Sequence, residues 1–492
     1  MTEEKDHFDI IIVGGGPAGS CAALRLLELG YRVALIEERI FPRNQIGESL
    51  SPGIVNIFDY LQAGHLLNDS QYLRGLAASV IWESQSVNNV IAAQRGPGVM
   101  VDRGKLDQDM VELALGRGLY LFQPAKFQSA IKIDNEWQVN LLQDGKKITL
   151  SSIFVLDGRG RKGAGTRERI LLAPAGVALW VNIPAVLLPN ETLVEAVTNG
   201  WLWGSPTTDC QFRIMAYIDP DEVKGNAFTT VFGQLISNSV LFRSAADIHH
   251  LYHLYACPVV TYCHDHPWND KYIKIGESAF TLDPLSSTGV EKAMRLSLQA
   301  VIAIHTAFLT GDESMPQTFY ESRVIESVCA HSQWTADYYA QAWPGKSFRF
   351  WRDHSTVSPK AKTIKTPFHH QLESKLNDPR IIEQSKPSAQ IHVSAALRLI
   401  WNTNVRLSSD LAYLQVPCVV GDHLEFKGAV KHPNIAREIT YLEEIELIPL
   451  LKIIHEVETF GVIITRWSKL ISFEQAARTG IYLYHRGLLC NA

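Results

Sequence analysis

The sequence has little net charge and no long uncharged apolar run, and each absence argues against a class of function. Its 492 residues carry 46 lysines and arginines against 51 aspartates and glutamates, so no basic field predicts binding to nucleic acid. No stretch of 18 uncharged apolar residues occurs, and the most apolar region, 445–465, is interrupted by Lys452, His455, Glu456 and Glu458. That region predicts an amphipathic helix and a strand, and we expect no membrane span.

Cysteine is also sparse, and the first residues lack a secretory pattern. Seven cysteines, an odd number without tight spacing, are typical of a protein in a reducing compartment. The opening stretch MTEEKDHFDI is acidic and polar, without a basic segment followed by an apolar one. These features predict a cytoplasmic location.

A histidine-rich segment, HHLYHLYACPVVTYCHDH (249–266), contains the ligand types of a zinc site without the spacing. His249 and His253 stand four residues apart, which suits a metal only if the segment is helical. No Cys-x-x-Cys pair occurs, and the spacing fits no common zinc class. We interpret these histidines as packing or surface residues and expect no metal.

A strand–helix–strand pattern opens the chain and carries a glycine motif. Residues 8–14 and 31–37 predict buried strands, and residues 17–30 predict a helix between them. A glycine-rich turn also occurs for packing alone, but this context favours a dinucleotide whose pyrophosphate approaches the helix N-terminus. Glu37, at the end of the second strand, can accept hydrogen bonds from a ribose 2′-OH. The three motif glycines are Gly14, Gly16 and Gly19.

The remaining pattern predicts two parts. We expect a core over residues 1–365, with an inserted substrate sheet at about 165–265 and a hairpin turn at Asp144-Gly145. A linker is predicted over 366–389, followed by a separate unit over 390–492.

Later stretches distinguish FAD from NAD. In chain order they read FPRNQIGESLSPG (41–53), VDRGKLDQDM (101–110), VLDGRGRKG (155–163), GWLWGSP (200–206) and IGESAFTLDPLSSTGV (275–290). Over roughly residues 7–345 this series resembles the FAD-dependent monooxygenase superfamily, and within it the tryptophan-halogenase-like branch. The resemblance implies an α/β fold with a Rossmann-like FAD domain of the glutathione-reductase and aromatic-hydroxylase type and a β-sheet substrate domain.

The resemblance also implies cofactor-binding roles. Two arginines would contact the FAD, an aspartate and a glycine would lie near its ADP half, and a glycine–acid pair would hold its ribityl-phosphate arm. Aspartate is usual in that pair, where this chain has glutamate. The two arginines are Arg43 and Arg103. The aspartate and glycine near the ADP half are Asp157 and Gly160, and the pair that would hold the ribityl-phosphate arm is Gly276 and Glu277.

The turn DPLSSTG (283–289) precedes a predicted helix, and in the superfamily it faces the flavin ring. Its backbone N–H groups would stabilise the negative charge that the ring acquires on reduction, because a helix N-terminus favours anions. The implied contacts are Pro284, Ser287, Gly289 and Val290.

A flavin halogenase needs a lysine in a tunnel after the GESL segment, and this chain has no lysine between Glu48 and Lys105. The matching place falls at Gly75, next to Arg74, and arginine does not exchange protons because its pKa stays above ~12. The turn also carries Ser286 where halogenases typically have phenylalanine. Its DPLSS form resembles flavoproteins that mature cysteine tryptophylquinone by hydroxylating a tryptophan in a partner protein.

The resemblance therefore implies an FAD-dependent monooxygenase that hydroxylates an aromatic residue, tryptophan by this likeness, in a protein or peptide. It would use molecular oxygen and either NAD(P)H or a flavin reductase. A small-molecule aromatic hydroxylase or a halogenase with a displaced lysine is the first alternative. A flavin-binding scaffold that only docks a partner is the second.

Two residues are the catalytic candidates. Glu48 lies in the GES turn and acts either as an acid or base near the flavin or as a cap for the following helix. Trp203 alternates with Trp201, so both indoles lie on one face of a strand, where they either wall the substrate cavity or belong to the core.

The C-terminal unit predicts a strand, an acidic spacer and a series of helices, with a capping box at Ser472. Its near-zero net charge argues against binding to DNA. It resembles the winged-helix modules that grasp peptides in peptide-maturation enzymes, and shielding of the flavin domain is the alternative role.

Overall fold

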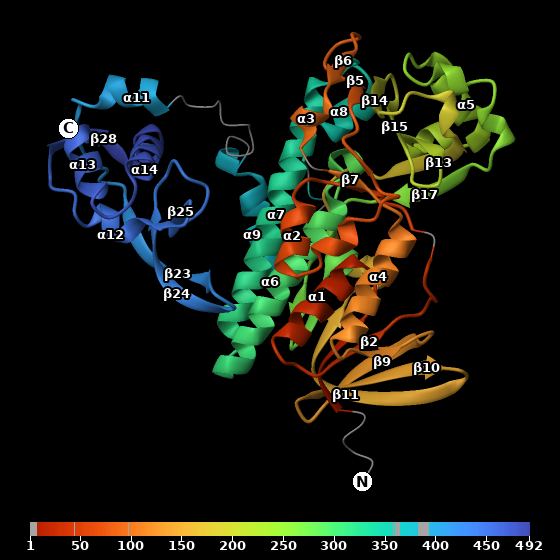
Figure 1. Cartoon of the computed structure of the whole chain (residues 1–492), viewed down its shortest axis with the longest axis horizontal. Coiled ribbons are helices and arrows are strands. Elements are labelled where there is room, and N and C mark those ends of the chain that lie inside the picture. The colour runs from red at the N-terminus through yellow and green to blue at the C-terminus, as the bar shows by residue number, and fades with distance from the viewer. Residues whose placement is uncertain (1–6, 44, 97, 358, 360–364, 382–392) are drawn as a thin grey trace. The chain divides into compact units, whose positions relative to one another are not determined.

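The computed structural model describes residues 7–43, 45–96, 98–357, 359, 365–381 and 393–492. The chain divides into two compact units, Met1–Leu376 and Asn377–Ala492. Figure 1 shows the elements of each unit with their labels. The predicted linker is wrong at its beginning, because helix α9 (Pro367–Leu376) buries Phe368 and Leu372 and packs against α7 (Ser314–Gln341) of the first unit. Residues 382–389 of that linker lie outside the described residues.

The first unit is built on a parallel sheet. Its strands follow the order β20-β11-β1-β2-β8, and all four neighbouring pairs are parallel. The central strands are apolar where they pair, over residues 10–13, 33–36 and 154–156, because a parallel sheet is buried on both faces. Their bounds are β1 (His7–Val13), β2 (Val33–Ile36), β8 (Tyr120–Phe122), β11 (Lys146–Asp157) and β20 (Tyr272–Lys274).

Helices pack beside this sheet, and α1 (Pro17–Glu28) lies against both α4 (Arg103–Gly116) and α6 (Gly289–Thr310). The buried face of α1 is made of small residues such as Ala18, Cys21 and Ala22, which allow close approach. Among the described residues, α6 alone is long and apolar enough to cross a membrane. More than half of that apolar stretch is buried inside the unit, as in the core helices of soluble proteins.

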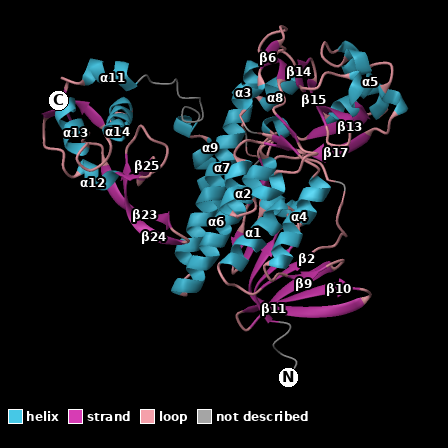
Figure 2. Cartoon of the chain, viewed as in Figure 1, coloured by secondary structure: helices cyan, strands magenta, loops and turns pink. Residues whose placement is uncertain are grey.

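An antiparallel extension continues the sheet, as Figure 2 shows in the strand colour. Strands β9 (Lys126–Ile133) and β10 (Glu136–Gln143) form a meander with the first half of β11. Asp144 and Gly145 connect β10 to β11 with φ angles of 50° and 75°. The predicted hairpin and its turn are therefore confirmed.

The second sheet of this unit has seven strands in the order β17-β13-β16-β15-β14-β5-β6. Two of them, β5 (Ala78–Ile81) and β6 (Asn88–Val90), precede the predicted insertion, so the sheet does not arise from residues 165–265 alone. β14 pairs with β5 in parallel, which joins the two segments. The other strands are β13 (Gly176–Pro184), β14 (Thr192–Val197), β15 (Gly200–Pro206), β16 (Gln211–Ile218) and β17 (Tyr255–Val259).

Smaller elements complete the unit. One face of the seven-stranded sheet forms an apolar core with α5 (Phe228–Asn238). Two three-stranded sheets follow the orders β3-β7-β4 and β12-β18-β21. The remaining elements are α2 (Ile54–Tyr60), α3 (Ala92–Arg95), α8 (Arg349–His354), β3 (Ser49–Leu50), β4 (Leu73–Arg74), β7 (Val99–Met100), β12 (Arg169–Leu171), β18 (Tyr262–His264), β19 (Trp268–Asn269) and β21 (Phe280–Thr281).

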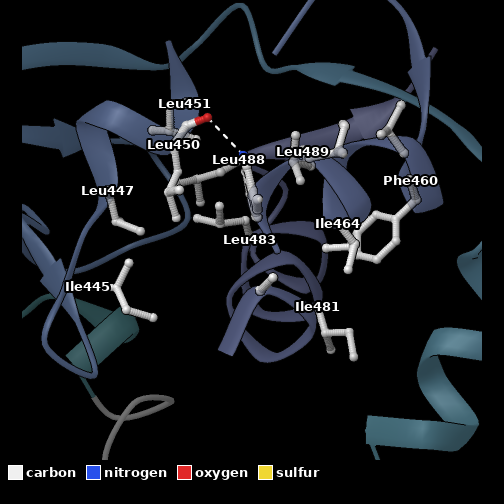
Figure 3. Packing of buried hydrophobic residues seen from close by; sticks show 14 of the residues in the cluster. Ile445, Leu447, Leu450, Leu451, Phe460, Ile464, Ile481, Leu483, Leu488 and Leu489 are labelled. Carbon is white, nitrogen blue, oxygen red and sulfur yellow. Dashed lines mark hydrogen bonds between the residues drawn. The ribbon is translucent and has the colours of Figure 1, made fainter. Parts of the chain in front are cut away.

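The second unit is an α+β fold with its own core, and its likeness to a winged helix stays a prediction. Two helices, α13 (Phe460–Trp467) and α14 (Phe473–His485), accompany the sheet β27-β22-β28, and Ser472 caps α14 with the predicted capping box. Figure 3 shows leucines and isoleucines from several elements of this unit gathered in one cluster. The remaining elements are α11 (Val393–Ile400), α12 (Leu447–Leu451), β22 (Asn404–Leu407), β23 (Ala412–Val420), β24 (His423–Lys431), β25 (Tyr441–Leu442), β26 (Ile445–Glu446), β27 (Glu458–Thr459) and β28 (Leu489–Asn491).

Candidate active site

A cavity of about 950 Å³ lies within the first unit. Its walls come from the carboxyl ends of the parallel strands, from the N-termini of α1 and α6, and from one face of the seven-stranded sheet. Cofactor pockets typically measure ~300–1,000 Å³ and occur at such strand ends. One cavity therefore joins the predicted nucleotide site to the predicted substrate sheet.

The three motif glycines have different tasks. Gly14 has a φ of +105°, and a Cβ there would lie 2.5 Å from the carbonyl oxygen of Gly158. A Cβ at Gly19 would overlap the carbonyl group of Gly14. At Gly16 a Cβ would meet only the guanidinium of Arg43, at 3.5 Å. Gly14 and Gly19 are therefore required for packing, whereas Gly16 leaves room on the cavity wall.

Both helix N-termini at the cavity lack a side-chain cap. Gly16 before α1 has no side chain, and the side chain of Thr288 before α6 accepts no hydrogen bond from the first turn of its helix. The free N–H groups of such turns favour anions. This arrangement fits an FAD, because the N-terminus of α1 could hold its pyrophosphate and the N-terminus of α6 could stabilise negative charge on its flavin ring.

A buried network surrounds the predicted ribose position. Glu37 accepts hydrogen bonds from the backbone N–H groups of Gly15 and Arg39, at 2.8 and 2.9 Å, and these fix its carboxylate at the end of β2. Arg43 lies 3.6 Å from Glu37 and 3.8 Å from Asp107. Burial raises the pKa of Asp107, although neighbouring arginines oppose this shift.

The second predicted arginine, Arg103, belongs to the same network. It binds Asp107 at 3.1 Å and donates to the carbonyl groups of Ile46 and Gly47. These contacts hold Ile46 and Gly47 against α4. Arg43 and Arg103 both lie on the cavity wall, and their contact with FAD stays a prediction.

Of the residues predicted for the ADP half and for the ribityl-phosphate arm, three line the cavity and one does not, and their contacts with FAD stay predictions. Gly160 and Gly276 line the cavity with φ angles of 63° and 56°. Glu277 also lines it, with half of its side chain exposed and its carboxylate 3.5 Å from Arg161. Asp157 does not line the cavity. It is fully buried, and Arg159 and other neighbours hold its pKa below the usual range despite that burial.

The turn before α6 presents its backbone to the cavity. Pro284, Ser287, Gly289 and Val290 all line the wall. Ser287 adopts a left-handed conformation with a φ of 53°, which ends the short helical turn Pro284–Ser286 and lets α6 begin two residues later. Asp283 accepts the N–H of Leu285 at 3.0 Å and holds this turn in place.

A buried hydrogen-bonded chain runs from this turn to the substrate sheet. Tyr339 of α7 donates its hydroxyl to Asp283, and Trp201 donates its indole N–H to the Tyr339 oxygen at 3.1 Å. Asp283 and Trp201 both line the cavity. Burial raises the pKa of Asp283 to about 6, because the two hydrogen bonds to its carboxylate only partly offset its desolvation.

Glu48 does not cap the helix that follows it. Helix α2 has no side-chain cap, and the Glu48 carboxylate instead accepts the N–H of Gly47 at 3.0 Å. It also forms an ion pair of 2.7 Å with Arg213 of β16. Glu48 lines the cavity, so its predicted location is compatible with acid–base chemistry, while its role stays a prediction.

The tryptophans of GWLWGSP lie on the cavity side of the sheet. Trp201 is buried in an aromatic cluster and also reaches the cavity wall, so both expectations hold for it. Trp203 is half-buried and pairs across the sheet with Met215, which in turn pairs with Trp180. These three residues form an aromatic and apolar row on the wall.

No lysine occupies the substrate end of the described cavity wall. The two lysines that line the cavity, Lys126 and Lys162, come from β9 and from the turn after β11, on the nucleotide side. Gly75, the place matched to the halogenase lysine, lies in a separate hollow with Arg74.

The histidine-rich segment is spread over several elements. His249 lies in a short helical turn, with its ring beside the carbonyl group of Ala246, and His264 lies in β18 beside Glu168. Within the described residues, no group of three or more histidine, cysteine, aspartate and glutamate side chains is arranged to hold a metal ion.

Sequence reasoning missed Arg213, Asp283 and Tyr339. The alternating pattern QFRIMAYI places Arg213 and Met215 on one face of a strand, and this pattern could have identified Arg213 from the sequence. Tyr339 lies 56 residues from Asp283, and no local pattern reveals that contact.

Comparisons with known proteins agree with this geometry. The family model described as "Glucose inhibited division protein A" matches residues 9–146. The tryptophan 2-halogenase of Chondromyces crocatus is 27% identical over 349 residues, which cover 63% of this chain and 64% of that enzyme, just under two thirds of its length.

Two solved structures match nearly the whole chain. The flavin-dependent halogenase CmlS superposes with a TM-score of 0.77 at 19% identity, covering 99% of this chain and 96% of that one. The peptidyl tryptophan dihydroxylase QhpG, which is essential for tryptophylquinone cofactor biogenesis, superposes with a TM-score of 0.72 at 18% identity, covering 98% and 100%. At these identities the structural matches establish the fold.

The parallel sheet, the glycine motif and the joined cavity define an FAD-dependent flavoprotein. The chain is similar in sequence to a tryptophan halogenase, and its fold is similar to those of a flavin-dependent halogenase and a peptidyl tryptophan dihydroxylase.

Proposed function

We propose that this enzyme is a monooxygenase that hydroxylates an aromatic residue, tryptophan in the first instance, in a protein or peptide. The observation that carries the proposal is the substrate end of the cavity, which combines a tryptophan-lined wall with a glutamate–arginine pair and offers no lysine among the described residues. A halogenase needs that lysine to guide its oxidant, whereas oxygen transfer to an electron-rich ring does not.

When bound, reduced FAD supplies the activation of molecular oxygen, and NAD(P)H or a flavin reductase supplies its electrons. The chain positions the reaction. Trp180 and Trp203 can hold an aromatic ring by stacking, which favours offset or edge contacts. Glu48, which Gly47 and Arg213 hold in place, can accept a proton from the substrate at its carboxylate.

The second unit supports a protein or peptide substrate. Within the described residues, β23 pairs only with β24, so its outer edge keeps unpaired backbone groups. Tyr413 and Phe426 are more than half exposed on this hairpin. Exposed edges of this kind accept an extended peptide as an added strand.

The test is co-expression with the products of neighbouring genes, followed by mass spectrometry of those products. We expect a gain of oxygen atoms on a tryptophan-containing peptide, with none when the enzyme is omitted. Oxygen consumption without any modified protein or peptide would contradict the proposal.

The second candidate is a flavin-dependent halogenase, which the sequence match to a tryptophan halogenase favours. The same mass spectra separate the two, because halogenation replaces hydrogen by a halogen and gives a characteristic isotope pattern. A halogenated product formed in the presence of chloride or bromide would favour this second candidate.

A further inference from the structure

On the seven-stranded sheet a polar row follows the aromatic row, and Arg213 is the member of this polar row that lines the cavity. The aromatic row is Trp180, Met215 and Trp203, and two residues further along the strands lie Asn182, Arg213 and Ser205, paired side by side. Two residues of a strand span ~7 Å, so the centres of the two rows are about that far apart.

Arg213 is fixed in this row by two partners. Its Nε donates to Oδ1 of Asn182 at 2.9 Å, and its Nη1 lies 2.7 Å from Glu48. The side chain is 19% exposed, and among the residues of this sheet that line the cavity it is the only charged one described.

The polar row keeps hydrogen-bond donors that the described protein does not use. A guanidinium carries five N–H donors in a planar fork, and no described residue accepts from Nη2 of Arg213. Because Oδ1 of Asn182 accepts from Arg213, its amide nitrogen is a second donor, and no described residue accepts from it either. Of these two groups, the guanidinium of Arg213 lies on the cavity wall, and its unused edge is suited to the oxygens of a carboxylate.

A purely structural ion pair explains less of this geometry. An ion pair whose only task was to hold Glu48 would not need Asn182 to orient the guanidinium of Arg213. It would also not need an arginine, which has more N–H donors than the single Glu48 carboxylate accepts. Arginine forks suit bidentate binding of carboxylates. Glu48 balances the arginine's charge, and the unused Nη2 edge remains for a ligand.

We propose that Arg213, aided by Asn182, binds a carboxylate of the substrate, so that the enzyme selects aromatic substrates with an acidic group ~7 Å from the reacting ring. In a peptide this group is a neighbouring acidic side chain or the terminal carboxylate. The inference rests on the proposed function for its aromatic ring, and it adds the charge of the substrate.

The test uses the FAD-loaded full chain and three indole probes of similar size: indole-3-propionate, its neutral amide, and tryptamine. Binding is measured by calorimetry and by perturbation of the flavin spectrum. We expect the propionate to bind roughly 10- to 100-fold more tightly than the amide, the ratio that a charge-assisted hydrogen bond supports. Tryptamine should bind most weakly.

Substitutions assign that preference to Arg213. Arg213→Met should abolish it and Arg213→Lys should keep part of it, while the exposed Arg243→Met serves as a matched control and should keep all of it. Because Arg213→Met leaves Glu48 without its cation, the double variant R213M/E48Q provides a charge-balanced form in which the preference should also be lost.

The proposal would be overturned if the wild type bound the propionate and the amide equally, or if it showed no saturable binding of the propionate. A preference for the propionate that survives in both Arg213→Met and R213M/E48Q would also overturn it. A preserved preference in the wild type together with no oxygenated product counts against the proposed function and leaves the Arg213 site intact.

Discussion

The hydroxyl of Tyr339 lies 2.9 and 3.1 Å from the two carboxylate oxygens of Asp283, in the interior of the first unit. The same hydroxyl accepts the indole N–H of Trp201. One tyrosine therefore links the turn before α6, helix α7 and strand β15 of the seven-stranded sheet. Two hydrogen bonds, from the Leu285 N–H and the Tyr339 hydroxyl, lower the pKa of Asp283 against the effect of its burial. No described cation contributes to this lowering, so the negative charge of Asp283 depends on these hydrogen bonds.

Tyr339→Phe should destabilise the first unit more at pH 7.5 than at pH 5. Above the Asp283 pKa of about 6 the tyrosine donates to a charged carboxylate, a bond worth ~1.5–3 kcal/mol, and below it to a neutral acid, a bond worth ~0.5–1.5 kcal/mol. The temperature of FAD release from the full chain measures this difference. Tyr320→Phe is the matched control, because that buried hydroxyl donates to the carbonyl group of Lys274. An equal loss at both pH values in Tyr339→Phe would contradict the linkage.

Asp283 itself should make stability fall as the pH rises from about 4 to about 6. Its folded pKa of about 6 exceeds the ordinary value of 3.8, so the folded state binds the proton more tightly than the unfolded state. The stabilisation is complete below the lower value and is lost as the pH rises through the higher one, by an amount on the order of 3 kcal/mol. Thermal melting of wild type and Asp283→Asn should differ in slope across this window and run parallel above pH 7.

Much of the nucleotide half could be predicted from the sequence, because its signals are local. The glycine turn at 14–19, Glu37 and the Asp144-Gly145 hairpin each depend on neighbours in the chain. The strand–helix–strand order then places them at one sheet edge. Asp157 shows where this stops. Its position in VLDGRG suggests a cofactor contact, yet the carboxylate points into a buried network with Arg159 and Tyr272.

The substrate half was less predictable because its contacts join distant segments. Arg213 meets Glu48 across 165 residues of sequence, and β5 and β6 belong to a sheet whose other strands begin about a hundred residues later. The helix α9 was missed for another reason. Its polar, histidine-bearing sequence is typical of a linker, and only packing of Phe368 and Leu372 on α7 orders it.

Gly16→Val should fold but lose FAD, whereas Gly19→Val should fail to fold. A side chain at Gly16 meets only the flexible end of Arg43 and projects where the pyrophosphate is predicted, while one at Gly19 collides with the backbone of Gly14. Flavin absorbance after purification and far-ultraviolet circular dichroism separate the two outcomes. Normal FAD content in Gly16→Val would show that the motif does not bind the cofactor.

Free tryptophan should not be halogenated when the enzyme is supplied with reduced FAD, oxygen and either chloride or bromide. The reason is the substrate end of the described cavity wall, which offers Arg213 and no lysine. Liquid chromatography with mass spectrometry detects the product, and a known halogenase under the same conditions provides the positive control. Stoichiometric halogenated tryptophan would show that another group replaces the lysine.

Deletion of residues 377–492 should leave the flavin chemistry intact and abolish modification of a protein or peptide substrate. The first unit keeps its own core, and every residue that lines the cavity lies within it, so FAD binding and peroxide-forming oxygen consumption should persist. The deleted unit has a separate apolar core and an open strand edge, which suit capture of an extended peptide. Paired assays on one preparation provide the control, namely oxygen consumption for the first unit and mass spectrometry of the co-expressed partner for the second. If the shortened enzyme modified its partner at the full rate, the second unit would have a shielding role instead of a peptide-binding one.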